Sequence, residues 1–268
     1  MDRTPLNFAF SSCPNDTFAF HAIVHGLVAG PAVIPYIDDV EALNARAERG
    51  EAEVTKISIA AYGRIRDRYA LLRAGGAAGF GVGPIVVGRR SAGGLGRRVA
   101  IPGERTTAAL LLRLLGQFDT VPMRFDRIAD AVLRGDVDSG VLIHEGRFTY
   151  EGEGLVLLAD LGAEWESRMR CPLPLAAIAI RRDLSDRCEA FDRALRSSVE
   201  YAFAHPDASR EYVVGHAQEM DASVVARHIA LYVNDYTAAL DERAVHMLLE
   251  FADTHASPVR GERPPVFL

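Results

Sequence analysis

The chain has 268 residues, of which 49% are hydrophobic and 25% charged, and these globular values exclude a disordered, collagen-like or coiled-coil chain. Its net charge of -6 argues against general nucleic-acid binding, because contacts to phosphates need clustered cations. No apolar run approaches the roughly 18 residues of a membrane span, and the N-terminus has no apolar export-signal core. We therefore expect a cytoplasmic protein that binds neither nucleic acid nor membrane.

The first third of the chain alternates strands with helices. The patterns predict a buried strand at residues 6–10 and further strands at 33–37, 54–58 and 85–88. The loop that follows the first strand ends at Asn15 or Asp16, either of which can cap a helix. A second helix opens at Asp38-Asp39 and ends at Gly50. The glycine-rich residues 91–96 then form a crossover to a second unit.

The second unit repeats this order of elements. It predicts a strand at 98–101, a loop at 102–107 followed by a leucine-rich helix, a strand at 122–125, a helix opened by Asp126, and a strand at 140–143. Arg-Gly-Glu-Ala-Glu at 49–53 matches Arg-Gly-Asp-Val-Asp at 134–138, each before a strand. The repeat predicts two similar α/β lobes with mostly parallel sheets. The alternative is that any α/β chain shows this alternation of strands and helices, so that the match does not indicate a repeat.

An apolar strand at 174–180 carries the chain back to the first lobe, and four helices follow at 188–204, 206–216, 221–233 and 241–255. We expect a discontinuous lobe I (1–92 and 175–268) and a lobe II (93–174). The crossings near 91–96 and 172–175 form a hinge, and a cleft lies between the lobes. Ligands of such sheets bind beyond the carboxyl ends of the strands.

Several hydroxyl groups fall in the loops that should line this cleft. Ser11, Ser12, Thr106 and Thr107 precede helices, whose N-termini favour anions. Ordinary helix capping is the alternative for each of them. Lys56 is one lysine among 29 arginines, which is either chance or a place that a guanidinium does not suit. With Ser58 beside it, the pattern predicts a carboxylate or phosphate site.

His144 is the strongest candidate for chemistry. It ends an apolar strand at the cleft, and its pKa, near 6.5 when unperturbed, suits proton transfer. A hydrogen-bonded structural histidine is the alternative. His21 and His25 have the spacing of a metal pair but no third ligand, so we expect no metal. No glycine-rich phosphate motif is present, so we expect no nucleotide cofactor.

The remaining cysteine and histidine residues carry weaker signals. Cys13 could be a thiolate at a helix N-terminus, although a structural, partly buried cysteine is the expectation. Five histidines lie in the helical C-terminal part, and we expect them on the surface or in packing: His205, His216, His228, His246 and His255.

Together these residues resemble a known family. Its motifs are Ser-Ser-Cys-Pro-Asn-Asp-Thr-Phe at 11–18, Thr-Lys-Ile-Ser at 55–58, Gly83-Pro84, Thr106-Thr107 and Ile-His-Glu-x-Arg-Phe-Thr-Tyr at 143–150. They resemble the 1,4-dihydroxy-6-naphthoate synthases of the futalosine route to menaquinone. The resemblance covers nearly the whole chain. The chain differs at Ser12, where the family often has Pro, and at Ile57, where Leu is common.

The resemblance implies a two-lobed, periplasmic-binding-protein-like (type II) fold. It implies a carbon–carbon lyase that converts cyclic dehypoxanthinyl futalosine to 1,4-dihydroxy-6-naphthoate without a cofactor. The family's proton acceptor corresponds to His144. The expected substrate-binding residues are Ser11, Asn15, Asp16, Lys56, Ile57, Ser58, Thr106 and Thr107.

The expected partner is a small molecule with an aromatic carboxylate, which suits anion-binding loops, and the expected assembly is a monomer or a weak homodimer. Two alternatives stay open. One is a chorismate dehydratase-like enzyme of the same pathway, against which the Cys-Pro-Asn-Asp and His144 motifs argue. The other is a solute-binding protein for a small carboxylate, against which the missing export signal argues.

Overall fold

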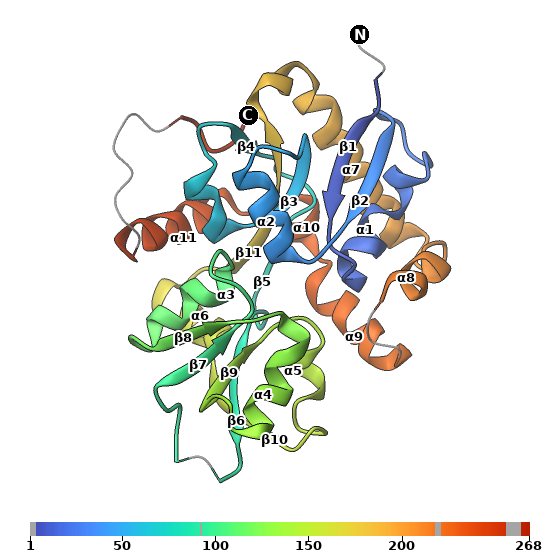
Figure 1. Cartoon of the computed structure of the whole chain (residues 1–268). Helices are drawn as coiled ribbons and strands as arrows, with labels where there is room; N and C mark the ends of the chain where they lie inside the picture. Colours follow the sequence, from blue (N-terminus) through green and yellow to red (C-terminus); the bar gives the residue numbers. More distant parts are fainter. Residues whose placement is uncertain (1–3, 92, 218–220, 256–263) are drawn as a thin grey trace.

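Two β-sheets, each flanked by helices, make up the two lobes of the computed structural model (Figure 1). The structure describes residues 4–91, 93–217, 221–255 and 264–268. Both ends of the chain lie on the upper lobe in Figure 1, and the lower lobe is built from the middle of the chain. This arrangement agrees with the two-lobed α/β fold expected from the sequence.

The first sheet has the strand order β2-β1-β3-β11-β4, and β5 also pairs with β11. Its strands are β1 (Leu6–Phe10), β2 (Val33–Ile37), β3 (Val54–Ser58), β4 (Tyr69–Leu71), β5 (Ala77–Gly79) and β11 (Leu173–Arg181). The strands β1, β2 and β3 are parallel, whereas β11 is antiparallel to β3. Short β4 and β5 were not predicted, because three residues carry too little periodicity to identify a strand.

The second sheet has the order β10-β6-β9-β7-β8. Its strands are β6 (Ile85–Arg89), β7 (Arg98–Ile101), β8 (Asp119–Pro122), β9 (Ser139–Leu142) and β10 (Leu155–Asp160). Strand β8 begins three residues before the expected strand at 122–125. The parallel order β8-β7-β9 followed by antiparallel β6 matches β2-β1-β3 followed by β11. The sequence repeat therefore corresponds to a repeat in the fold.

The place of the first crossing differs from the expectation. Strand β6 pairs with β9 and β10, so it belongs to the second sheet, whereas the expected boundary at residue 92 puts it in lobe I. Its apolar sequence fits either sheet, and only the pairing decides. The chain therefore crosses between β5 and β6, ahead of residues 91–96, and residue 92 itself lies outside the described part. Strand β5 pairs antiparallel with the start of β11, so the two crossings lie side by side.

Helices cover both faces of the first sheet. The helices of lobe I are α1 (Pro14–Val24), α2 (Val40–Glu48), α7 (Ser185–Ala204), α8 (Arg210–His216), α9 (Ala222–Tyr232), α10 (Asp235–Ala238) and α11 (Glu242–His255), with 3-10 turns η1 (Ile59–Arg64) and η4 (Arg182–Leu184). Helix α1 begins with Pro14 and has Cys13 at its N-cap, so the expected cap at Asn15 or Asp16 was wrong. The Asp39 side chain caps α2, as the sequence indicates. Beneath β1, rings of Phe8, Phe20 and Phe191 pack edge to face.

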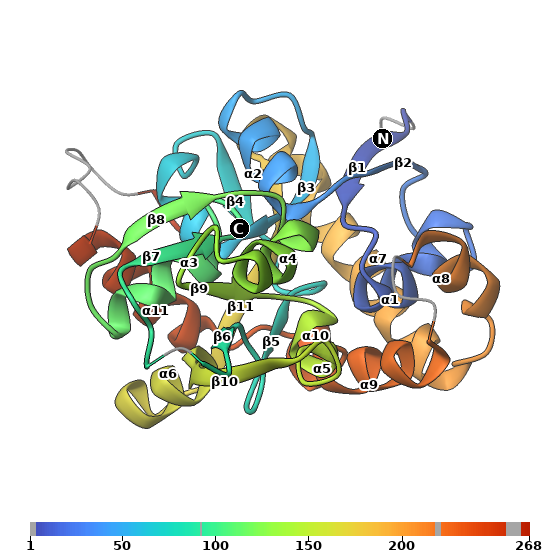
Figure 2. The same ribbon diagram turned by 60° about the horizontal axis from the view of Figure 1, so that its bottom comes forward.

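Lobe II carries shorter helices, and one of them reaches lobe I. They are α3 (Thr107–Leu111), α4 (Ile128–Arg134), α5 (Gly146–Thr149) and α6 (Leu161–Met169), with 3-10 turns η2 (Leu112–Leu114) and η3 (Phe125–Arg127). Gly135 ends α4 with a φ of 81°, a conformation that suits glycine. Figure 2 shows α5 next to α9, and the rings of Phe148 and His228 join the two helices at 6.3 Å.

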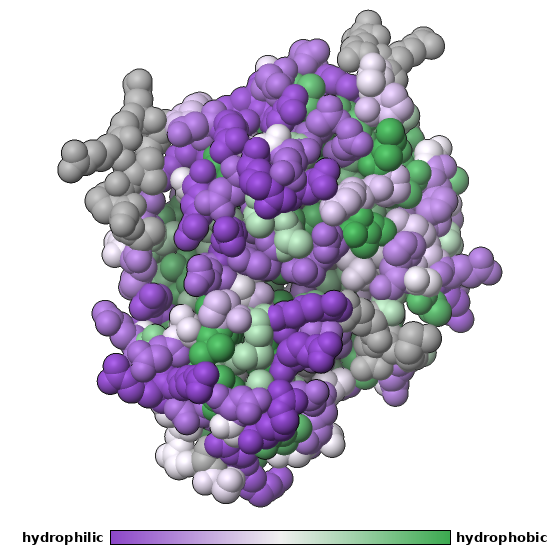
Figure 3. Space-filling view, in the orientation of Figure 1, coloured by the Kyte–Doolittle hydropathy of each residue, from purple (hydrophilic) through white to green (hydrophobic). Residues whose placement is uncertain are grey.

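The surface shown in Figure 3 is largely hydrophilic, with apolar patches scattered over both lobes. Within the described residues, no helix combines the length and the apolar character needed to span a bilayer.

Candidate active site

A small cavity of about 100 Å³ lies between the lobes, at the carboxyl ends of the parallel strands. Seven of the predicted site residues line it: Ser11, Asn15, Lys56, Ser58, Thr106, Thr107 and His144. Two others do not. The side chain of Ile57 is fully buried in the core, because it points to the opposite face of β3 from its neighbours, and Asp16 lies behind the cavity wall.

His144 follows strand β9 and reaches the cavity from lobe II. Its backbone has a φ of 56°, a left-handed conformation that is uncommon outside glycine and often marks functional positions. Its ring meets that of Phe125 edge to face at 4.8 Å. Burial within the cleft, helped by the positive charge of Lys56, lowers the pKa of His144 to about 4. The ring is therefore neutral at pH 7, as a proton acceptor requires.

Cys13 approaches His144 across the cleft from lobe I. Its Sγ lies 3.1 Å from Nδ1 and 3.7 Å from Nε2 of the imidazole. Burial, together with the negative charge of Asp16, raises the pKa of Cys13, so the thiol keeps its proton. A structural cysteine was expected at this position, but the loop after β1 brings the thiol next to the candidate base.

Asp16 organises the polar groups on the lobe I side. Its carboxylate forms an ion pair with Lys56 and accepts hydrogen bonds from Ser11 Oγ at 2.6 Å and Asn15 Nδ2 at 2.7 Å. Both ionic side chains are almost fully buried. The charge of Lys56 is thus balanced within the protein, and an anion entering the cavity meets a neutral pair instead of a free cation.

The hydroxyl groups expected to bind an anion have partners of their own. Thr106 donates to the carbonyl of Gly103 at 2.8 Å and caps α3 by accepting from Ala109 N at 3.1 Å. Thr107 donates to the carbonyl of Leu175 at 2.7 Å. The capping alternative therefore describes Thr106 in this structure. Ligand contacts to these groups need the hydroxyl oxygens as acceptors, or a rearrangement of the donors.

Ser58 is held in a similar way. Its hydroxyl accepts a hydrogen bond from Nδ2 of Asn44 at 3.0 Å, and its main-chain N–H donates to Oδ1 of the same side chain at 2.8 Å. Strands β1 and β3 pair only as far as Ala9 and Thr55, so beyond that point they diverge. The cavity opens at this divergence, which is why the residues from Lys56 onward can reach it.

His228 is a cavity residue that the sequence analysis assigns to surface or packing. Only 1% of its surface is exposed, and it lines the cavity together with Tyr232. Burial, with smaller effects of His144 and Lys56, lowers the pKa of His228 to about 3. Val224, His228 and Tyr232 are buried at successive turns of α9, and this spacing of four was the available signal.

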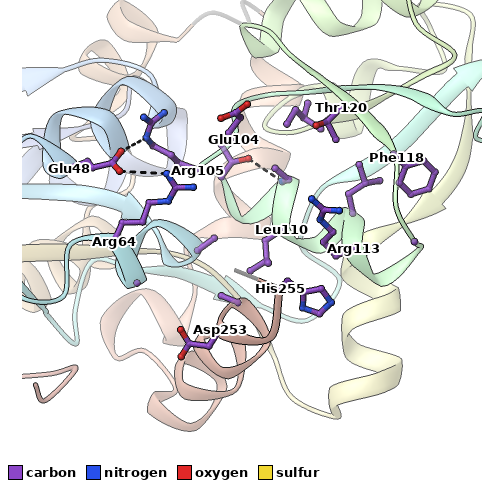
Figure 4. Close-up of a pocket in the computed structure, with 18 residues that line it drawn as sticks. Glu48, Arg64, Glu104, Arg105, Leu110, Arg113, Phe118, Thr120, Asp253 and His255 are labelled. Atoms are coloured by element: carbon purple, nitrogen blue, oxygen red, sulfur yellow. Dashed lines mark hydrogen bonds and ion pairs between the residues drawn. The ribbon is translucent and has the colours of Figure 1, made fainter. Parts of the chain in front are cut away.

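A second cavity, of about 560 Å³ (Figure 4), shares Thr106 with the first one in its lining. Charged residues from both lobes line it, and three of them, Glu48, Arg64 and Arg105, form ion pairs with one another. Arg105 of lobe II binds Glu41 at 2.9 Å and Glu48 at 2.6 Å, both in lobe I. Arg64 approaches Glu48 at 3.5 Å. We name Arg105, Glu41 and Glu48 the interlobe latch, because these pairs join the two lobes beside the cleft.

Across the described ranges, no three or more His, Cys, Asp or Glu side chains are grouped so as to hold a metal ion. The site thus consists of a neutral imidazole, a protonated thiol, a buried Asp–Lys pair, partnered hydroxyls and a second buried imidazole. Such a set can bind a polar organic molecule and transfer a proton within a closed cleft.

Comparison with known sequences identifies the relatives of this chain. A family model described as menaquinone biosynthesis matches residues 6–257. A protein of Thermus thermophilus named 1,4-dihydroxy-6-naphthoate synthase is 48% identical over 266 residues, which cover 97% of this chain and 98% of the relative. A Streptomyces coelicolor protein of the same name is 48% identical over 255 residues, with 90% and 89% coverage.

Comparison with solved structures supports the fold. A protein of Archaeoglobus fulgidus superposes with a TM-score of 0.87 at 40% identity, covering 94% of this chain and 97% of its own. The ligand-binding component of an ABC-type import system from Staphylococcus aureus has a TM-score of 0.71 at 12% identity, with 94% and 92% coverage. The second match shows the fold alone, which is that of periplasmic binding proteins.

Proposed function

Because this chain belongs to the menaquinone biosynthesis family, we propose that it is a carbon–carbon lyase that converts cyclic dehypoxanthinyl futalosine to 1,4-dihydroxy-6-naphthoate. Its relatives from Thermus thermophilus and Streptomyces coelicolor are enzymes named for this naphthoate. The observation that carries the proposal is the neutral ring of His144, held at the interlobe cavity.

His144 is the proposed general base. The substrate has a cyclised, sugar-derived part with acidic protons. When His144 takes one of them, the electron pair left behind cleaves a carbon–carbon bond, and the sugar-derived fragment leaves and takes up a proton. Aromatisation then gives the naphthoate and makes the step favourable. A depressed pKa keeps the ring in the form that accepts the proton, and the nearby Lys56–Asp16 pair adds a fixed dipole to the site.

Cys13 is the proposed positioning residue for this base. The His144 backbone is in a left-handed conformation, and the thiol reaches the ring from the other lobe at 3.1 Å. A thiol is a weak donor and a weak acceptor. It can therefore orient the imidazole without forming the strong charge-assisted bond that a carboxylate would form.

The proposed substrate-binding residues are those that line the cavity, together with Asp16 and Ile57. Asp16 acts by fixing Ser11, Asn15 and Lys56. Ile57 can contribute only through its main chain, because its side chain is in the core. The aromatic carboxylate of the substrate would lie near Lys56 and the N-terminus of α1, whose partial positive charge favours an anion.

Substrate entry requires the lobes to separate. Pockets that hold small molecules usually measure about 300–1,000 Å³, and the cavity of about 100 Å³ is smaller. The paired strands β5 and β11 form the two crossings between the sheets and are the proposed hinge. After closure, Cys13 meets His144 and the interlobe latch forms, which excludes water while the intermediate aromatises.

The test is direct. The pure protein is incubated with cyclic dehypoxanthinyl futalosine, and the naphthoate is detected by mass. We expect His144→Ala to fold and to lose at least about a hundredfold in turnover, the usual contribution of a positioned base. His205→Ala, at an exposed histidine beyond α7, is the matched control and keeps its turnover. Absence of product from the wild type rejects the reaction, whereas near-native turnover of His144→Ala rejects only the base.

A further inference from the structure

A buried chain of hydrogen bonds runs from Lys56 to His228, a cavity residue that the proposed reaction does not use. Asp16 pairs with Lys56, Asn15 Nδ2 lies 2.7 Å from Asp16 Oδ1, and Asn15 Oδ1 lies 2.9 Å from His228 Nε2. Each of the four side chains joined by these hydrogen bonds is at least nine-tenths buried. Buried polar groups of this kind have defined partners, so their donors and acceptors can be assigned in sequence.

The assignment fixes the tautomer of His228. A carboxylate paired with Lys56 only accepts hydrogen bonds, so Asn15 must turn its NH₂ group toward Asp16. The amide oxygen of Asn15 then faces His228, and it too only accepts. Nε2 of His228 must therefore carry the proton, and Nδ1 of the neutral ring must carry a lone pair.

That lone pair has no partner in the part of the chain that the structure describes. The ring lines the interlobe cavity, with its centroid 6.4 Å from that of His144. A buried acceptor without a donor is unfavourable and uncommon in native proteins. The pKa of about 3 keeps the ring unprotonated at neutral pH, so it stays an acceptor. Burial also disfavours a charged donor such as an ammonium group.

We propose that Nδ1 of His228 is a specificity subsite that accepts a hydrogen bond from a hydroxyl group of the bound ligand. The proposal rests on the proposed function, in which both the sugar-derived substrate and the dihydroxynaphthoate product carry hydroxyl groups. It adds a point of recognition contributed by α9 of lobe I, whose His228 contacts Asn15 in the first turn of α1. A ligand that lacks the hydroxyl leaves Nδ1 unpaired and binds more weakly.

The test combines two ligands with two variants. The ligands are 1,4-dihydroxy-6-naphthoate, kept free of oxygen, and 2-naphthoate, which has the same rings and carboxylate without hydroxyl groups. His228→Gln keeps an amide N–H near the place of Nε2 but removes the Nδ1 acceptor. His205→Gln, at an exposed position, is the matched control. Affinities come from titration calorimetry, and thermal unfolding verifies that each variant is folded.

We expect wild type and His205→Gln to bind the dihydroxy ligand about tenfold more tightly than 2-naphthoate. This is the usual cost of leaving one buried acceptor without its hydrogen bond. In His228→Gln the preference falls to within about twofold. An undiminished preference in His228→Gln overturns the subsite while leaving the proposed function intact, and Nδ1 then binds water. A wild type that binds the dihydroxy ligand no more tightly than 2-naphthoate also overturns the subsite, whereas the reaction is judged only by product formation.

A second measurement does not need the variant. Long-range ¹⁵N–¹H correlation spectra of the histidine rings distinguish a protonated nitrogen from one with a lone pair. We expect His228 of the free protein to be protonated at Nε2 alone, and its Nδ1 resonance to shift with the dihydroxy ligand but not with 2-naphthoate. A proton on Nδ1 in the free protein, or equal shifts with both ligands, overturns the proposal.

Discussion

Acidification should destabilise this protein through His228, and the effect can be calculated. The pKa of the ring is about 3 in the folded protein and about 6.5 in an unfolded chain. Between these values the unfolded chain binds a proton that the folded protein does not bind. The free energy of unfolding therefore falls as the pH falls through this window, and it is recovered as the pH rises above about 6.5.

The magnitude follows from linkage. Moving from pH 7 to pH 5 adds nearly one proton to the unfolded ring and almost none to the folded one, which costs the folded state about 2 kcal/mol. The ring is 1% exposed, so solvent screening does not reduce this value appreciably. Any folded-state pKa well below 5 gives the same loss, since the unfolded pKa then sets the window.

Urea unfolding at pH 7 and pH 5 measures the effect in wild type, His228→Gln and the control His205→Gln. Carboxylates contribute equally to all three, so their effect cancels in the comparison. We expect the loss of stability between the two pH values to be smaller by about 2 kcal/mol in His228→Gln alone. Equal losses in wild type and His228→Gln would refute the claim that His228 is buried as a neutral ring.

Three further substitutions test the site. Lys56→Arg should lower both stability and turnover, because the planar guanidinium does not fit the space in which the ammonium group meets Asp16; urea unfolding and kinetics that match wild type would make the lone lysine an accident of composition. Cys13→Ala should fold normally and lower kcat by about ten- to a hundredfold with little change in KM, because His144 loses its contact across the cleft; an unchanged kcat would contradict the positioning role. Arg105→Gln should open the interlobe latch and increase the radius of gyration in small-angle scattering, and saturating 1,4-dihydroxy-6-naphthoate should reverse the increase; a scattering profile identical to wild type would show that the latch does not hold the lobes closed.

The sequence predicted the repeated α/β plan because its signals are local. Asp39 caps α2 as expected, and the two Arg-Gly-acid segments do precede β3 and β9. Strand β6 was assigned to the wrong sheet, since an apolar run of five residues does not specify its neighbours. Register and sheet membership depend on contacts between segments far apart in the chain, which one sequence does not reveal.

The site was predicted to a similar extent. His144 could be found because it ends an apolar strand, and the cavity does contain it. The pairing of Lys56 with Asp16 joins residues forty positions apart, so the sequence, which indicated only an anion site at Lys56, could not reveal it. His228 was missed because a buried histidine within an amphipathic helix resembles a packing residue until its neighbours are known. Its partner Asn15 is 213 positions away.

The chain returns from lobe II to the first sheet through β11, and this order of strands has a consequence for folding during synthesis on the ribosome. All strands of the second sheet lie between Ile85 and Asp160, so lobe II can fold as soon as that continuous stretch has emerged. The first sheet cannot be completed until β11 is made, and until then the edge of β3 is open to other chains. The segment made first thus finishes folding last. Slower synthesis of the stretch between β3 and β11 therefore leaves β3 unpaired for longer, even when every residue of lobe I is intact.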